Sequence, residues 1–225
     1  MKKVLIALIG GSAIGFASLA QAADLPYRSN APQSYDYPPS FTWTGFYVGA
    51  QLGAGFGGFN GPGANYLGSS PGGGLLGLTV GYNYQSGNLL IGGEGDYAWS
   101  HIADSATYLP GVSSTGVVQN IDTIRARVGY AADRFLAYGT GGYAGANIRG
   151  VLHNFPASSV ADQTLYANGF TLGFGVEYAI TPHITAKAEY LYVSLASNNY
   201  FGGTPNYTSA GTNLNLLRAG VNYKF

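Results

Sequence analysis

The last nine residues of the chain are Leu217-Arg218-Ala219-Gly220-Val221-Asn222-Tyr223-Lys224-Phe225. Apolar or aromatic side chains occupy every second position, and the residues between them are polar, charged or glycine. Successive side chains of a β-strand point to opposite faces, so this stretch predicts a strand with one apolar and one polar face. In a membrane barrel, the apolar face of such a strand contacts lipid and the polar face lines the lumen.

The same alternation recurs upstream, and it is weakest in the glycine-rich fifth segment. Three connections between these segments are short sets of turn-forming residues, and four are long. Short turns at one end and long loops at the other are typical of outer-membrane barrels, whose short end is periplasmic. We therefore predict an all-β fold, an eight-stranded antiparallel up-and-down transmembrane β-barrel with short periplasmic turns and long extracellular loops. The predicted strands are 46–56, 76–84, 89–99, 124–130, 135–148, 170–178, 184–192 and 217–225, and the long loops are 57–73, 101–116, 149–167 and 196–212.

A soluble barrel with an apolar interior is the main alternative. The charged residues within strands fall almost entirely on the face opposite the aromatic side chains, and an eight-stranded barrel is too narrow to enclose so many aromatic rings. The charges are therefore predicted to face the lumen, where unpaired charges are costly. We expect Glu94 and Asp96 at the heights of Arg127 and Arg125, Glu177 opposite Lys187, and Glu189 opposite Arg218, which would close the lumen with ion pairs.

The N-terminus has the pattern of a secretory signal peptide. Lys2 and Lys3 precede an apolar stretch over 4–19, and Ala20-Gln21-Ala22 fits a cleavage site. The stretch is short for a transmembrane anchor. The next segment is rich in proline and tyrosine and shows no periodicity. We expect a signal peptide over 1–22, a periplasmic leader over 23–41, and the barrel over 42–225.

Composition excludes several classes of function. Only 9% of residues are charged, against about a quarter in typical soluble domains. The chain has no cysteine, so it has neither disulfides nor thiolate metal sites. Without Lys2 and Lys3, 10 − 2 = 8 basic residues stand against 10 acidic ones, which argues against nucleic acid as a partner.

Both ends resemble a known family. Ala22-Ala23-Asp24-Leu25-Pro26, the stretch from Phe41-Thr42-Trp43 to Ala50, and the terminal strand are similar to alphaproteobacterial outer-membrane barrels of the opacity-type porin family. The resemblance implies an abundant surface protein that keeps the envelope intact, with no catalytic residues. It also implies that the chain end, with Val221, Tyr223 and Phe225, is read by the barrel-assembly machinery. Some relatives bind haemin or host surfaces through their loops.

Chemistry at the loops is weakly indicated. A haemin site needs an axial His or Tyr on an apolar surface, and His153, Tyr108 and Tyr166 are the candidates. The histidines lack a convincing carboxylate partner for catalysis, so we expect no enzyme and no cofactor. The sequence favours a structural envelope protein of the bacterial outer membrane, in contact with lipid. A small-solute porin, or haemin or host-surface binding through the loops, remains the alternative.

Overall fold

The computed structural model describes residues 41–61, 70–109, 112–154, 159–200 and 208–225. The chain divides into two units, Met1–Pro38 and Pro39–Phe225. The second unit contains the barrel. The predicted signal peptide and all of the predicted leader except Phe41 lie outside the described residues. No helix in the described part of the chain is long and apolar enough to cross a membrane.

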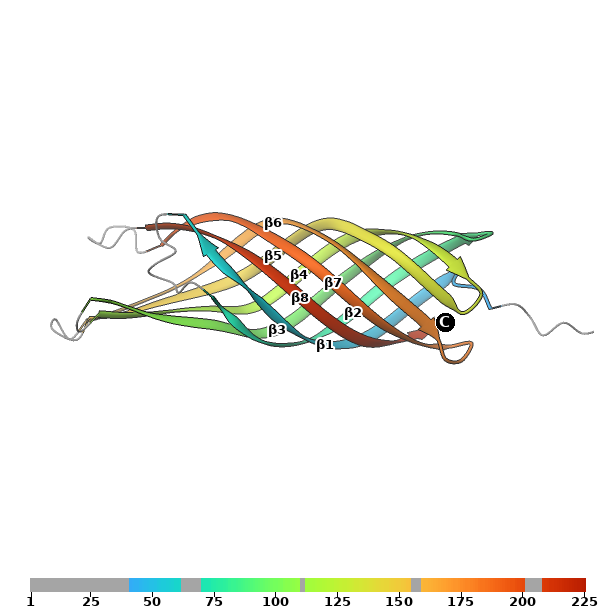
Figure 1. Cartoon of the computed structure of the whole chain (residues 1–225), viewed down its shortest axis with the longest axis horizontal. Helices are drawn as coiled ribbons and strands as arrows, with labels where there is room; N and C mark the ends of the chain where they lie inside the picture. The colour runs from blue at the N-terminus through green and yellow to red at the C-terminus, as the bar shows by residue number, and fades with distance from the viewer. Residues whose placement is uncertain (1–40, 62–69, 110–111, 155–158, 201–207) are drawn as a thin grey trace, which may run out of the picture. The chain divides into compact units, whose positions relative to one another are not determined.

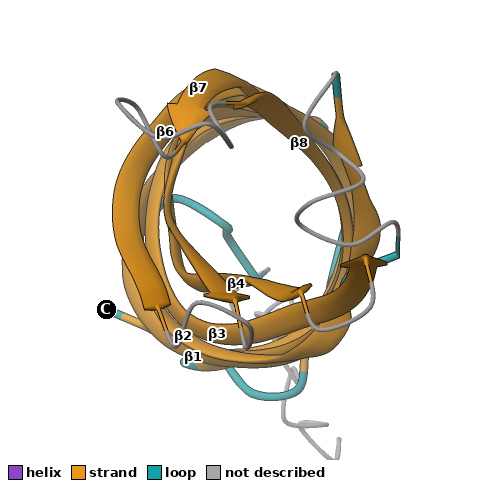
Figure 2. Cartoon of the chain, turned by 90° about the vertical axis from the view of Figure 1, so that its left-hand side faces the viewer, coloured by secondary structure: helices purple, strands orange, loops and turns teal. Residues whose placement is uncertain are grey.

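Within the described ranges, eight antiparallel strands form one closed barrel in chain order, and β1 pairs with β8 to complete the ring (Figures 1 and 2). Each strand pairs with its neighbours in sequence, so the topology is up-and-down as predicted. The strands are β1 Gly45–Asn60, β2 Gly72–Ser86, β3 Leu89–Leu109, β4 Val112–Ala132, β5 Phe135–Asn154, β6 Ser159–Ala179, β7 Ile184–Tyr200 and β8 Thr208–Lys224.

The strands are longer than predicted, and most of the residues assigned to two long loops are strand. β3 continues to Leu109, and β4 already begins at Val112. Likewise, β5 continues to Asn154, and β6 already begins at Ser159. Register shifts between Trp99 and Ile102, and between Val118 and Asn120, interrupt the alternation. On β5 and β6 the apolar side chains change from the outer to the inner face instead. Both effects end the simple periodic pattern although the strand continues.

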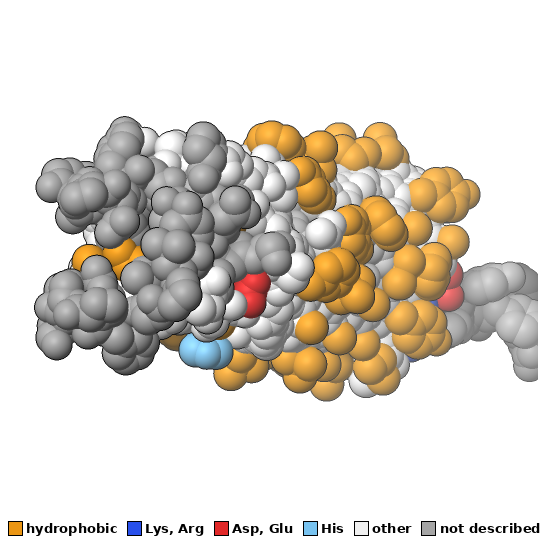
Figure 3. Space-filling model, turned by 60° about the vertical axis from the view of Figure 1, so that its left-hand side comes forward, with side chains coloured by type: hydrophobic (Ala, Val, Ile, Leu, Met, Phe, Trp, Pro, Cys, Tyr) orange, Lys and Arg blue, Asp and Glu red, His pale blue; other side chains and the backbone are white. Residues whose placement is uncertain are grey.

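The outer wall carries a continuous apolar band that begins at the short turns. Phe46, Leu78, Ile124 and Phe174 are all more than half exposed there. Figure 3 shows hydrophobic side chains gathered over one part of the outer surface. On several strands the band ends at an aromatic residue, after which polar side chains follow. These aromatic residues are Phe56, Trp99, Tyr143, Phe170 and Tyr192.

The inner wall is divided by height. Buried charged side chains occupy the middle of the barrel, and a buried apolar cluster occupies the end with the long hairpins. That end therefore has the arrangement of a soluble protein, with an apolar interior and a polar exterior. The inner face can be apolar in this half, because strands that leave the lipid band no longer need an apolar outer face. The cluster includes Phe59, Leu75, Ile102, Val118, Ile148, Leu191, Leu195, Leu214 and Leu216.

Candidate functional site

The centre of the lumen is a buried network of charged side chains. Arg125 on β4 forms ion pairs with three carboxylates, those of Glu94, Asp96 at 2.6 Å and Glu189 at 2.9 Å. These carboxylates lie on β3 and β7, and all four side chains are almost completely buried. Arg125 therefore links two opposite walls of the barrel. Such a contact both neutralises charge and fills the space between the walls.

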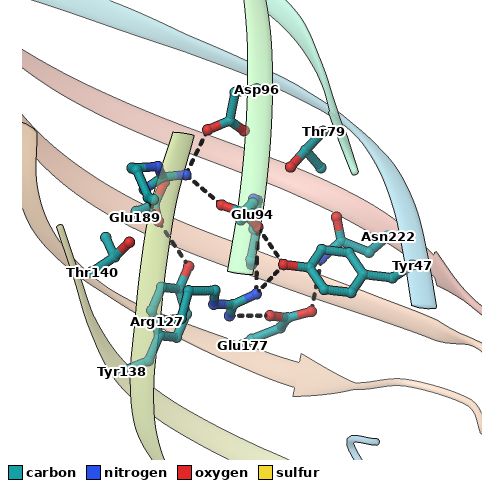
Figure 4. Close-up of polar contacts among 12 residues, drawn as sticks. Tyr47, Thr79, Glu94, Asp96, Arg127, Tyr138, Thr140, Glu177, Glu189 and Asn222 are labelled. Atoms are coloured by element: carbon teal, nitrogen blue, oxygen red, sulfur yellow. Dashed lines mark hydrogen bonds and ion pairs between the residues drawn. The ribbon is translucent and has the colours of Figure 1, made fainter. Parts of the chain in front are cut away.

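Arg127 forms the second centre of the network. Its guanidinium group pairs with Glu177 at 2.8 Å and with Glu94 at 3.4 Å. It donates a hydrogen bond to the Tyr47 hydroxyl at 2.7 Å, and its central carbon lies 3.9 Å from the ring centroid of Tyr138. Figure 4 shows Arg127 between these partners. The positive charge is thus held by carboxylates and by the face of an aromatic ring.

Two more cations complete the charge balance. Lys187 pairs with Glu94 at 3.1 Å, and Arg218 pairs with Glu189 and with Asp96 at 3.5 Å. The network in the described lumen holds four carboxylates and four cations and is formally neutral. A neutral network with many partners per charge reduces the cost of burying the ions.

All eight residues predicted for the lumen meet there, but several partners differ from the prediction. Glu94 lies opposite Arg125 in the register, and Asp96 lies opposite Thr123, so the β3–β4 pairing is shifted by one residue pair. Glu177 and Lys187 are cross-strand neighbours as expected. Their charges nevertheless reach across the lumen, to Arg127 and Glu94 respectively. Long side chains in a narrow barrel select partners by distance across the interior as well as along the wall.

Sequence reasoning missed the uncharged members of the network. The Tyr47 hydroxyl donates to Glu94 at 2.8 Å, and the Tyr138 hydroxyl donates to Glu189 at 3.2 Å. Thr123 donates to Asp96 and Asn222 donates to Glu177. Tyr47 lies on the same strand face as Gln51, whereas Phe46 lies on the outer face. The parity of Tyr47 in the alternation therefore indicated a side chain that faces the lumen.

Two glycines provide the room that the tyrosines need. A Cβ at position 81 would lie 2.3 Å from the Tyr47 hydroxyl, and one at position 175 would lie 2.6 Å from the Tyr138 ring. Both distances are far shorter than a van der Waals contact. The glycine-rich composition therefore serves, at these positions, to admit large side chains into a narrow interior.

The periplasmic mouth is occupied by the segment that precedes β1. Trp43 is 1% exposed and packs in a cluster with Leu90, Leu136 and Tyr138. Its backbone N–H donates to Gln85 Oε1 at 2.8 Å, and its indole N–H donates to the Asp133 carbonyl at 3.0 Å. Asp133 lies in the β4–β5 turn, on the side of the ring opposite β1. Residues 41–44 therefore cross the mouth.

The predicted assembly residues are on the outer wall. Val221, Tyr223 and Phe225 are each about half exposed or more. The backbone N–H of Phe225 donates to the Phe46 carbonyl at 3.0 Å, which extends the pairing of β8 with β1 by one bond. The terminal residue thus takes part in closing the ring and presents its ring on the apolar band.

Two of the candidate haemin residues, His153 and Tyr166, are not brought together. His153 lies on β5 opposite Val160, whereas Tyr166 lies opposite Asn147. Six residues along β5 separate the two positions, which corresponds to about 20 Å. Tyr108 is on β3, and its side chain lies outside the described residues. Among the described residues, no group of three or more His, Cys, Asp or Glu side chains is placed to hold a metal ion.

The closed up-and-down ring, the lipid-facing apolar band and the charged interior define an integral outer-membrane barrel protein. Residues 12–225 match the family described as "Outer membrane protein beta-barrel domain". The chain belongs to this family.

The relatives agree with this assignment. The chain is 33% identical over 246 residues to the 31 kDa outer-membrane immunogenic protein of Brucella melitensis biotype 1, covering 100% of both chains. It is 32% identical over 191 residues to a 22 kDa outer membrane protein of Rhizobium leguminosarum bv. viciae, covering 83% of this chain and 80% of that one. Among solved structures it is similar to Ail of Yersinia pestis, with 13% identity, a TM-score of 0.45, and coverage of 81% and 99%.

Proposed function

We propose that this protein is a closed structural barrel that keeps the outer membrane intact and displays its long hairpins at the cell surface. The organisation of the lumen supports this proposal. From the periplasmic mouth outward, the described side chains form the Trp43 cluster, the neutral charged network and an apolar core. A continuous water path would have to cross both apolar layers, and apolar constrictions oppose wetting.

Its partners in this role are lipid along the band and the barrel-assembly machinery at the terminal strand. A catalytic function has little support, because the histidines are dispersed. His101 lies on β3 and His153 on β5, and His183 lies in the β6–β7 turn, where its Nδ1 bonds the Lys224 carbonyl at 2.9 Å. We therefore propose a protein without enzymatic activity.

The two alternatives predict different observations. A small-solute porin needs an open lumen, which the buried network opposes. Haemin binding through the hairpins needs a ligand site, and two of its three candidate residues, His153 and Tyr166, lie far apart in the described strands. Host-surface binding stays compatible with a closed barrel, since it uses only the outer surface of the hairpins.

Conductance in a planar bilayer tests the closed lumen. We expect the wild-type protein to give no steady conductance and Arg125→Ala to admit small ions. Arg149→Ala is the matched control, because Arg149 pairs with Asp162 on the exposed outer surface. Steady conductance of the wild type would overturn the closed-lumen proposal. A deletion strain with unchanged resistance to detergent and to large antibiotics would overturn the structural role.

A further inference from the structure

The Asp122 carboxylate does not follow the inward pattern of charges. Asp122 on β4 lies on the same strand face as Ile124, which is 71% exposed to the lipid side, and opposite in direction to Arg125. Along β4 toward the long hairpins, Asp122 is the next outward-facing residue beyond Ile124, the last apolar residue of the band on this strand. Asp122 therefore lies at the boundary between lipid and the outer aqueous phase.

Aromatic side chains lie on both sides of Asp122, with Tyr97 on β3, Tyr143 on β5 and Tyr166 on β6 beyond it. Its register partner on β3 is Tyr97, whose ring contacts that of Trp99 with centroids 5.2 Å apart. On the other side, Tyr166 donates a hydrogen bond to Asp122 Oδ2 at 2.8 Å, and the Tyr143 and Tyr166 hydroxyls are 3.1 Å apart.

Room for this arrangement comes from β5. A Cβ at position 145 would lie 1.8 Å from the Tyr166 hydroxyl and 2.8 Å from Asp122 Oδ2. Gly145 therefore lets the phenol reach the carboxylate.

Asp122 has no cationic partner on the described part of the chain, because none of the salt bridges there includes it. A carboxylate beside lipid is costly without a counter-charge. A groove of about 920 Å³ between two rows of outward side chains runs from Asp122 past Tyr97, Leu78 and Val48. The groove is apolar, and the carboxylate stands at its outer end.

We propose that this groove binds an outer-membrane lipid whose headgroup carries an ammonium group. The ammonium lies on the Asp122 carboxylate between the aromatic rings, and an acyl chain occupies the groove. Aromatic faces attract organic cations, whereas Ca²⁺ and Mg²⁺ require six or more oxygen ligands. One carboxylate and two phenols would leave most of these positions to water, whereas the aromatic rings beside Asp122 suit an ammonium.

Fluorescence of Trp99 offers a direct test. The chain has two tryptophans, and Trp43 is buried in the periplasmic mouth, so brominated lipid reports on Trp99 alone. The folded protein is placed in phosphatidylglycerol bilayers that contain increasing fractions of either brominated phosphatidylethanolamine or brominated phosphatidylglycerol. We expect phosphatidylethanolamine to bind near Trp99 roughly two- to fivefold more strongly, the range for an exposed cation–π contact.

Asp122→Asn should remove this preference. Asp104→Asn removes the same charge from the part of β3 beyond the predicted strand end at Trp99, and it should retain the preference. Heat-modified mobility on gels verifies that each variant is folded. Equal quenching of the wild type by the two lipids, or an unchanged preference in Asp122→Asn, would overturn the proposal. A preference that disappears when a chelator removes divalent cations would assign the site to an inorganic ion instead.

Discussion

The indole N–H of Trp43 donates a hydrogen bond to the carbonyl oxygen of Asp133, at 3.0 Å and across 90 residues of chain. Asp133 has a φ of 51°, a left-handed conformation that is uncommon for a residue other than glycine. The β4–β5 turn thus presents its carbonyl to a ring that comes from the opposite side of the barrel. This contact joins the segment before β1 to the far wall and covers the periplasmic mouth.

Trp43→Ala should destabilise the barrel by about 3–5 kcal/mol, because it leaves a cavity where a fully buried ring was packed. Trp99→Ala is the matched control, since Trp99 is 54% exposed on the outer wall. Unfolding in urea, followed by heat-modified mobility on gels, measures both variants. Equal losses for the two tryptophans would contradict the assigned role of Trp43.

Arg125→Ala should destabilise the barrel by about 3–5 kcal/mol, because three buried carboxylates lose a shared partner. Arg149→Ala should be nearly neutral, since its pair with Asp162 is exposed and screened by solvent. The same unfolding assay compares them. If both variants unfold at the same urea concentration, the buried network does not stabilise the fold as described.

Tyr47→Phe should cost about 1–3 kcal/mol, because it removes the hydroxyl that joins Glu94 to Arg127 and leaves their buried polar atoms short of a partner. Tyr82→Phe on the outer wall, where the ring is 41% exposed, provides the control and should be nearly neutral. A neutral Tyr47→Phe would show that the hydroxyl is dispensable to the network.

Phe225→Ala should impair assembly in cells more than Phe174→Ala does. The two side chains are similarly exposed, at 67% and 65%, so both variants lose similar contact with lipid. Only Phe225 stands at the chain end that the assembly machinery is expected to read. The amount of folded protein in isolated outer membranes measures the effect, and equal amounts for the two variants would refute a special role for the terminal residue.

The orientation of the barrel predicts which sites are accessible on intact cells. His153→Cys, on the β5 extension, should react with an impermeant thiol reagent, and Ser86→Cys, at a short turn, should not. Disruption of the outer membrane should make Ser86→Cys reactive as well. The reverse labelling pattern would invert the topology.

The sequence alone predicted the ring and the charged residues of the lumen, because period-two alternation is a local property. Each strand except the glycine-rich β5 shows its lipid-facing set clearly in the printed residues, and the opposite parity identified the charges of the network. The compartment followed from the signal-like N-terminus and the terminal strand. Nothing beyond the pattern of neighbouring residues was needed for these predictions.

The tertiary structure alone decided the partners. The register between β3 and β4 depends on the whole ring. Glu94 therefore lies opposite Arg125, where Arg127 was expected, and Lys187 reaches Glu94 across the lumen. The place of Trp43 depended on a turn 90 residues away. The extended hairpins escaped prediction because apolar side chains change faces where the strands leave the lipid. Distances across a closed barrel are set by its curvature and strand tilt, which no local pattern records.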